Sequence, residues 1–202
     1  MNFYHNLITE KSFKFLQELH KKYQFVLIGG WAVFLYAKTL KSKDIDIIVE
    51  YEELEKLKKN FDLIKNQRLK KYEIKKEEID IDVYLPHFSS LGLPTEEVLK
   101  YLSQREGFKV PKIEALLILK QQVFGERKNS VKGKKDKLDI LSLIKIREIN
   151  WEYYQKILKK YRLEKLKNNL TELLKETKSA PEIGLNAWQM AKLKKRVLPF
   201  LF

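Results

Sequence analysis

The chain has 202 residues, 44% of them hydrophobic and 12% aromatic, and its 41 lysines and arginines against 27 acids give a formal charge of +14. This length and composition can bury about 70% of the unfolded surface, which excludes a disordered chain and allows one large or two small domains. The absence of cysteine excludes disulfides and thiolate metal sites. The N-terminus leads into charged residues and lacks the apolar core of a signal peptide, and the longest apolar runs are far shorter than the ~20 residues of a membrane span. We therefore expect a cytoplasmic protein.

The first 110 residues predict a mixed α/β unit, because short apolar segments alternate with stretches of helical period. A helix 96–103 with Thr95 as its N-cap is expected near the end of this unit. The other predicted elements are, in chain order, a helix 8–23, a strand 25–28, a buried helix 31–40, a strand 44–50, a helix 51–60, an antiparallel pair 68–75 and 79–85 with a turn at 76–78, and an extended piece 108–110.

Residues 111–202 predict a second, α-helical unit. Pro111 suits the first position of a helix, and further helices are expected over 134–147, 151–178 and 185–199. This part holds 22 basic and 10 acidic residues, whereas residues 1–110 hold 19 and 17. We therefore expect an α+β protein in which a basic helical bundle follows the mixed-sheet domain, and an excess of +12 favours contact with a polyanion.

Two glycines, Gly29 and Gly30, directly follow the strand 25–28. Glycine lets the backbone approach a phosphate closely, and the helix that begins at Trp31 directs its positive end to the same point. A tight strand-to-helix turn would need the same two residues. The pair therefore predicts phosphate binding, with the tight turn as the alternative.

Paired acids occur on two predicted strands. Side chains alternate along a strand, so Asp44 and Asp46 share one face, and Asp80 and Asp82 share one face of the strand 79–85. Carboxylates held close together repel each other unless a cation neutralises them, and magnesium prefers oxygen ligands. The pattern predicts a magnesium site, with a solvated sheet face as the alternative.

Together, the glycine pair, the Asp-Ile-Asp strand and the later strand acid resemble the nucleotidyltransferase superfamily that includes DNA polymerase β, over about residues 20–90. The resemblance implies that Asp44, Asp46 and a third strand acid hold two Mg²⁺ ions around a nucleoside triphosphate. Asp82 is the preferred third acid and Asp80 the alternative.

The same resemblance implies nucleotide binding by Gly29, Gly30 and Lys43. Many members of the superfamily have Gly-Ser where this chain has Gly-Gly. A serine hydroxyl contact to phosphate would then be missing, and backbone amides would have to supply it.

The helical part extends the resemblance. Lys120 shares a helical stripe with apolar residues, so we expect it to point inward and to need an anionic partner, unless it extends to the helix edge. Together with Arg127 and the Lys-Asp-x-x-Asp pattern from Lys135 to Asp139, it resembles the AbiEii-like branch, whose members include toxins of toxin–antitoxin systems. This implies that Lys120 and Arg127 bind the triphosphate and that Lys135 and Asp136 lie near the reaction centre. For Asp136, a favourable place in a helix's first turn is the alternative.

The implied reaction is the transfer of a nucleoside monophosphate from a triphosphate to a hydroxyl group, with two metal ions. The acceptor stays open between RNA such as tRNA, a small molecule and a protein side chain, and the toxin relatives raise the question of an antitoxin partner. The alternative is a catalytically inactive module of the same fold that binds a nucleotide or a partner.

Overall fold

The structure, a computed structural model, describes residues 2–202 and, for side chains, residues 6–202. The chain divides after Lys112 into two compact units, here called unit 1 and unit 2, the second running from Ile113 to Phe202. Unit 1 contains a mixed sheet and unit 2 is helical, so the predicted α+β class is confirmed. None of the helices within residues 2–202 combines the length and the apolar character that crossing a bilayer demands.

Unit 1 begins with a long helix and then alternates strands with helices. In chain order it contains α1 (Asn2–Lys22), β1 (Val26–Ile28), α2 (Gly29–Ala37), β2 (Ile45–Ile48), α3 (Tyr51–Asn60), β3 (Ile64–Asn66), β4 (Lys71–Lys76), β5 (Ile79–Tyr84), α4 (Thr95–Val98), β6 (Leu102–Arg105) and β7 (Phe108–Pro111).

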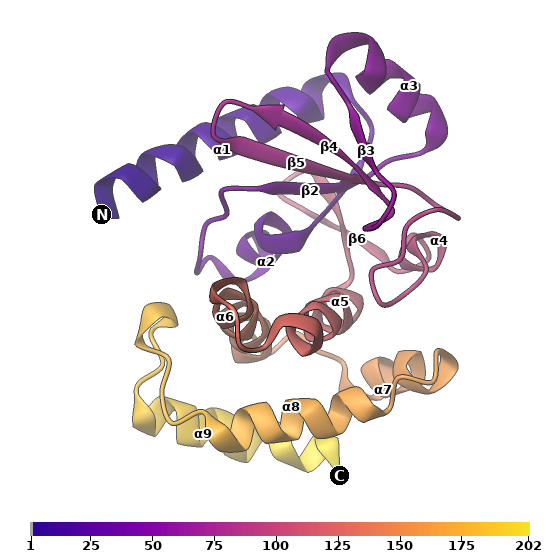
Figure 1. The fold of residues 1–202 in the computed structure, drawn as a ribbon. Coiled ribbons are helices and arrows are strands. Elements are labelled where there is room, and N and C mark those ends of the chain that lie inside the picture. Colours follow the sequence, from indigo (N-terminus) through magenta and orange to yellow (C-terminus); the bar gives the residue numbers. More distant parts are fainter. Residues whose placement is uncertain (1) are drawn as a thin grey trace. The chain divides into compact units, whose positions relative to one another are not determined.

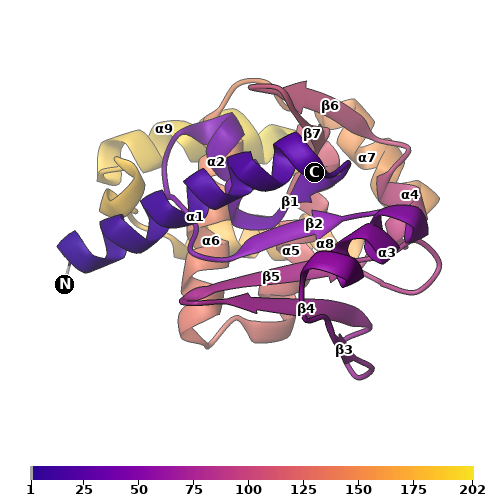
Figure 2. The same ribbon diagram turned by 90° about the horizontal axis from the view of Figure 1, so that it is seen from above.

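The main sheet has five strands in the order β1-β2-β5-β4-β3 (Figure 2). The central pair, β2 and β5, is parallel, and the other neighbours are antiparallel. The predicted pair of strands is present as the hairpin β4–β5, which turns at Glu77. The two acid-bearing strands are therefore direct neighbours at the centre of the sheet.

One face of this sheet forms the core of unit 1. Alternation places Ile45 and Ile47 of β2 beside Ile81 and Val83 of β5, and all four are almost fully buried. Helices α1 and α3 lie on one side of the sheet (Figure 1). The Lys76 ammonium, on the same face as Ile79, lies 4.2 Å from the Phe15 ring centroid of α1. The helices thus cover the apolar face, and the acids project from the other.

Two predictions for residues 95–111 are wrong. The helix expected over 96–103 ends at Val98, and its N-cap is Pro94 rather than Thr95. The chain then forms the hairpin β6–β7, which turns at Glu106 and Gly107, both with positive φ, the conformation of a tight hairpin turn. Pro111 is accordingly the last residue of a strand, and the helix starts at Ile113.

Unit 2 is a set of helices packed around one helix, α5, whose first nine residues are all buried. Its elements are α5 (Ile113–Arg127), α6 (Val131–Lys145), α7 (Trp151–Lys160), α8 (Lys165–Glu176), the 3₁₀ turn η1 (Pro181–Ile183), α9 (Ala187–Val197) and the 3₁₀ turn η2 (Leu198–Leu201).

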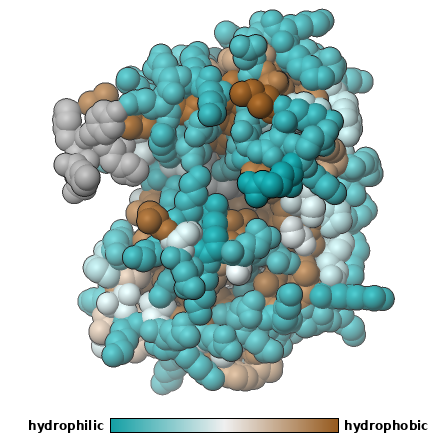
Figure 3. Space-filling model, in the orientation of Figure 1, coloured by the Kyte–Doolittle hydropathy of each residue, from teal (hydrophilic) through white to brown (hydrophobic). Residues whose placement is uncertain are grey.

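Buried polar groups tie these helices together. The Tyr154 hydroxyl of α7 donates to the Gln121 Oε1 of α5 at 2.8 Å, and the Gln121 Nε2 donates to the carbonyl of Leu166 in α8 at 3.0 Å. Buried polar groups cost stability unless they are hydrogen-bonded, so this chain of bonds fixes how the three helices meet. At the surface, hydrophilic residues cover most of the visible face (Figure 3).

Candidate active site

Three carboxylates cross the centre of the main sheet in one row. Asp46 of β2 is the register partner of Asp82 in β5, and Asp82 is the register partner of Glu73 in β4. Partners on adjacent strands lie about 4.8 Å apart and project to the same face. We call Asp46, Asp82 and Glu73 the acid row; Glu73 was not among the predicted site residues.

Asp44 lies outside this row, because β2 begins only at Ile45. The strand predicted over 44–50 is thus shorter, Ile45–Ile48, and Asp44 directly precedes it. Asp44 is nevertheless close enough for its charge to raise the pKa of Asp82. The competitor Asp80 is exposed and is the register partner of Lys75, so the register places Asp82, and not Asp80, beside Asp46.

The Asp46 carboxylate lies directly against Gly29, the first residue of α2. Gly29 has a φ of +65°, and a Cβ added there would overlap the carboxylate, with the Asp46 Cγ only 2.6 Å away. Both the backbone conformation and the close approach require glycine. The glycine pair thus makes a tight turn from β1 into α2. Gly29 leaves room for the Asp46 carboxylate at the start of α2, and Gly30 is buried within that helix.

A lysine compensates the acid row. The Lys71 Nζ of β4 lies 2.6 Å from the Asp82 Oδ2 and 3.1 Å from the Glu73 Oε1. The Asn66 amide donates a further hydrogen bond to the Glu73 Oε1 at 2.9 Å. Only 12% of the Lys71 side chain is exposed, so its ammonium is held within the row rather than in solvent.

These contacts shift the pKa values in different directions. Burial raises the pKa of Asp82, with the charges of Glu73 and Asp44 adding to it and Lys71 opposing it. The Lys71 hydrogen bond lowers the pKa of Glu73. Burial lowers the pKa of Lys71, but the hydrogen bond and charge of Asp82 outweigh it, so that pKa is raised overall. Of Asp82 and Glu73, Asp82 is thus the more ready to accept a proton.

Carboxylates of this kind are suitable ligands for magnesium. Among the described residues, however, no three His, Cys, Asp or Glu side chains lie close enough to hold one ion together. In their place the Lys71 ammonium neutralises the buried Asp82. The carboxylates of the acid row are therefore of the type that binds a divalent cation. In this structure the Lys71 ammonium pairs with two of them.

A second charged cluster joins α5 to α6 within unit 2. The Lys120 Nζ lies 2.6 Å from the Asp139 Oδ2 and 3.6 Å from the Asp136 Oδ1. Arg127 binds Asp136 through two hydrogen bonds, Nε to Oδ2 at 2.7 Å and Nη2 to Oδ1 at 3.1 Å. We call these four residues the α5–α6 tetrad.

The tetrad supplies the anionic partner that a buried Lys120 was expected to need. Asp139 has no exposed surface, and although its Oδ2 lies at ion-pair distance from Lys120, neither of its oxygens accepts a well-directed hydrogen bond from the described residues. Lys120 does not extend to the helix edge, since it is 9% exposed. Asp136 lies in the second turn of α6, which starts at Val131, so the first-turn alternative is wrong.

A glycine also shapes this cluster. A Cβ on Gly133 would lie 2.9 Å from the Arg127 carbonyl carbon, so only glycine lets the first turn of α6 approach the end of α5 this closely. The Ser130 hydroxyl caps α6 by accepting from the Gly133 N–H at 2.9 Å. The half-buried Lys135 follows on α6 outside the tetrad, and Lys43 is half-buried just before β2.

Comparison with known proteins gives a consistent result. The family described as "Nucleotidyltransferase of unknown function (DUF6036)" matches residues 7–192. A crystal structure of a candidate nucleotidyltransferase from H. pylori is similar over 96% of this chain and 95% of its own, with 17% identity and a TM-score of 0.52. An antigenic nucleotidyltransferase-like protein from Paracoccidioides brasiliensis is similar over 88% and 96%, with 16% identity and a TM-score of 0.43. At 17% identity the likeness to the H. pylori structure concerns the fold alone, and no curated protein matches the sequence.

Proposed function

This chain belongs to the DUF6036 family of nucleotidyltransferases, and from that membership we propose that it transfers a nucleoside monophosphate from a nucleoside triphosphate to a hydroxyl group. The family match confirms the predicted superfamily, while the AbiEii-like branch stays a prediction. The observation that carries the proposal is the pairing of Asp46 with Asp82 across parallel strands, next to a glycine turn that opens α2.

In the proposed reaction the acceptor oxygen forms a bond to the α-phosphorus, the bond from that phosphorus to the bridging oxygen breaks, and pyrophosphate leaves. Asp44, Asp46 and Asp82 would hold Mg²⁺, which neutralises phosphate charge and makes the acceptor hydroxyl more acidic. Asp82 would accept the acceptor proton, because burial and neighbouring acids raise its pKa toward the working range of a general base.

The basic residues of the predicted site have proposed roles in holding the triphosphate. The Arg127 side chain is 39% exposed, so its guanidinium can contact a phosphate while it stays paired with Asp136. Lys120 would have to leave Asp139 to do the same. Lys43, Gly29 and Gly30 are proposed nucleotide contacts on unit 1, and Lys135 and Asp136 are proposed to lie near the reacting groups.

A transfer assay with a matched pair of variants tests this function. The protein is incubated with Mg²⁺, total RNA including tRNA, and each triphosphate labelled at the α-phosphate or, in parallel, at the γ-phosphate. We expect the α-label alone to reach RNA, and Asp46→Asn and Asp82→Asn to lower transfer by at least 10³-fold. Asp80→Asn is the control, because it removes a carboxylate from the same strand outside the acid row.

Transfer that persists in both Asp46→Asn and Asp82→Asn, or that is lost equally in Asp80→Asn, would contradict the proposed site. Should no RNA be labelled, the same assay with protein and small-molecule acceptors decides whether another hydroxyl is used. Growth arrest on expression, relieved by Asp46→Asn, would support the finer proposal of a toxin held in check by an antitoxin protein.

One observation favours the second candidate, a module that binds a nucleotide or a partner without turnover. The Lys71 ammonium already pairs with the Asp82 carboxylate, and no three acids of the described chain lie close enough together to hold one metal ion. Equilibrium binding of triphosphate that is unchanged by Mg²⁺, with no transfer to any acceptor, would favour this module over the enzyme.

A further inference from the structure

A basic pocket lies between the end of α6 and α9, entirely within unit 2. Its volume is about 440 Å³. Five of its lining residues are cations, and no acid is among those that the structure identifies at its wall. The cations are Lys145, Arg147, Lys192, Lys195 and Arg196.

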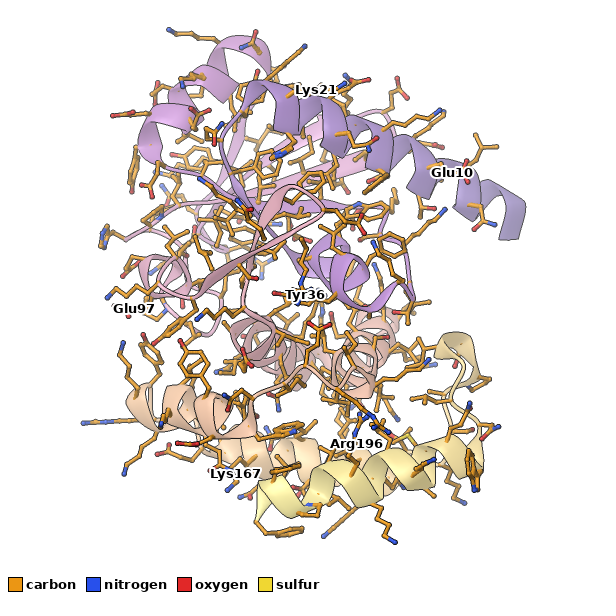
Figure 4. The ribbon with its side chains drawn as sticks, turned by 180° about the vertical axis from the view of Figure 1, so that it is seen from behind. Glu10, Lys21, Tyr36, Glu97, Lys167 and Arg196 are labelled. Atoms are coloured by element: carbon orange, nitrogen blue, oxygen red, sulfur yellow. The ribbon has the colours of Figure 1, made fainter. Side chains whose placement is uncertain are left out.

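Two of the five cations have a structural role. The Arg196 Nη2 donates to the carbonyl oxygens of Ile144 at 2.5 Å and Lys145 at 3.0 Å, at the end of α6. The Lys145 Nζ donates to the Ile183 carbonyl at 2.8 Å. Figure 4 shows the Arg196 side chain leaving α9 for the neighbouring helix. These bonds satisfy carbonyls that a helix end leaves without partners, so the fold explains Lys145 and Arg196.

The fold does not explain the other three. Arg147, Lys192 and Lys195 are exposed, and none forms an ion pair with an acid in the described part of the chain. Burial lowers the pKa of Arg196, and the positive charge of nearby Arg147 lowers it further. Like charges gathered in this way destabilise the protein until an anion binds among them.

An exposed tryptophan extends the pocket. Trp188 is 69% exposed, the most exposed of the three tryptophans, and its ring centroid lies 4.9 Å from the Lys192 Nζ. Trp188, Lys192 and Lys195 follow at positions i, i+4 and i+7 of α9, so they share one face of that helix. An exposed indole beside lysines offers a flat face for stacking in the same place as charge for phosphates.

We propose that this face, formed by Trp188, Arg147, Lys192 and Lys195, binds a single-stranded nucleic acid segment, with an unpaired base stacked on Trp188 and the backbone phosphates at the cations. An acidic peptide would use the cations but not the indole. In a duplex, base pairing and stacking cover the base faces, so an unpaired strand suits the indole better. The proposal goes beyond the proposed function, since it concerns binding and holds whichever hydroxyl accepts the nucleotide.

Binding is tested by fluorescence anisotropy with a labelled 12-nucleotide single strand, as RNA and as DNA of the same sequence, without triphosphate and at several salt concentrations. We expect Trp188→Ala to weaken binding about tenfold and Trp188→Phe to restore most of it. Arg147→Gln/Lys192→Gln/Lys195→Gln should reduce the slope of log K against log salt by about two, because each phosphate neutralised contributes about 0.7. Thermal melting checks that each variant is folded.

The control removes three exposed lysines elsewhere in unit 2, as Lys156→Gln/Lys159→Gln/Lys165→Gln. Equal weakening by this control, no effect of Trp188→Ala, or equally good displacement of the strand by polyglutamate would overturn the proposal, the last result pointing to an acidic protein partner. RNA and DNA both offer unpaired bases and phosphates, and comparing the two labelled strands shows which of them this face binds more tightly. Asp46→Asn should bind the strand normally and lose transfer, which agrees with both the proposed function and the proposed binding face. Transfer by a protein that does not bind the strand would contradict the binding face and leave the proposed function intact.

Discussion

The two charged clusters differ in how they are balanced. In the acid row of unit 1 one ammonium, that of Lys71, pairs with two carboxylates, Asp82 and Glu73, whereas the α5–α6 tetrad of unit 2 pairs two acids with two bases. The pairs of the tetrad join α5 to α6, so the cluster contributes to the fold whether or not Arg127 also contacts a phosphate. Under the proposed function, the acid row binds a further cation, Mg²⁺, which metal-assisted phosphoryl transfer requires. The following predictions test this difference, from the largest expected effect to the smallest.

Breaking the tetrad should cost the most stability. Asp139→Ala removes the carboxylate that lies 2.6 Å from the buried Lys120 ammonium, whereas Asp136 is 3.6 Å away, so we expect a loss of about 3–5 kcal/mol in the free energy of unfolding, measured by urea denaturation at pH 7. Lys120→Met/Asp139→Leu should recover most of this loss, because both charges leave together. Glu172→Ala, an exposed acid of α8, is the control. A loss below 1 kcal/mol for Asp139→Ala would show that the tetrad is not a structural unit.

Gly29→Ala should damage unit 1 more than Gly107→Ala. It places a Cβ at a φ of +65° and against the Asp46 carboxylate, so we expect about 1–3 kcal/mol of destabilisation and loss of transfer. Gly107→Ala separates the two causes, because Gly107 has a φ of +85° with nothing within 4 Å of an added Cβ. Equal stability losses in the two variants would mean that the close approach of Asp46 contributes nothing.

Removing the cation of the acid row should make the protein depend on added magnesium. Lys71→Met removes the ammonium that pairs with Asp82 and Glu73. We therefore expect the free energy of unfolding to fall by about 1–2 kcal/mol when a chelator removes divalent cations. Mg²⁺ should then raise the melting temperature more in this variant than in the unaltered protein. Lys75→Met, an exposed lysine on the same strand, serves as the comparison. An identical response to Mg²⁺ in all three proteins would argue against a cation site at the row.

The smallest effect concerns acid pH. The pKa of Glu73 is lowered in the folded state, so its stabilisation is present above the ordinary glutamate pKa of about 4.3 and is lost as the pH falls through the folded value. Asp82 acts oppositely, since a raised pKa favours the folded state at low pH. Glu73→Gln should therefore flatten the fall in stability between about pH 5 and pH 3, measured by urea denaturation, while Glu172→Gln should leave it unchanged.

Local patterns in the sequence predicted much of the candidate site. Alternation on the strand 79–85 placed Asp82 opposite the apolar face, and the position of Lys120 in an apolar stripe predicted its burial and its need for an acid. Both inferences depend on the period of a single element, which short-range sterics determine. Trp188 carries a similar signal, because lysines follow it at i+4 and i+7 on the same helix face.

Other features could not be read from one segment. Glu73 and Lys71 join the acid row only because β4 pairs with β5 in one particular register, and that register depends on the turn at Glu77. The hairpin β6–β7 was not predicted, because the helix expected over 96–103 includes the first residues of β6, although the extended piece expected over 108–110 falls within β7. In each case contacts between segments, rather than local preference, selected the structure.

By itself the sequence determined which faces of its helices and strands are apolar, where two glycines interrupt the chain and where charge accumulates, because these depend on residues close together along the chain. Tertiary structure alone decided that Asp46, Asp82 and Glu73 form one row, that Lys71 lies within it, and that Asp139 meets Lys120. Such contacts join residues whose separation is set by strand register and helix packing, where the free energy comes from burial shared between distant segments.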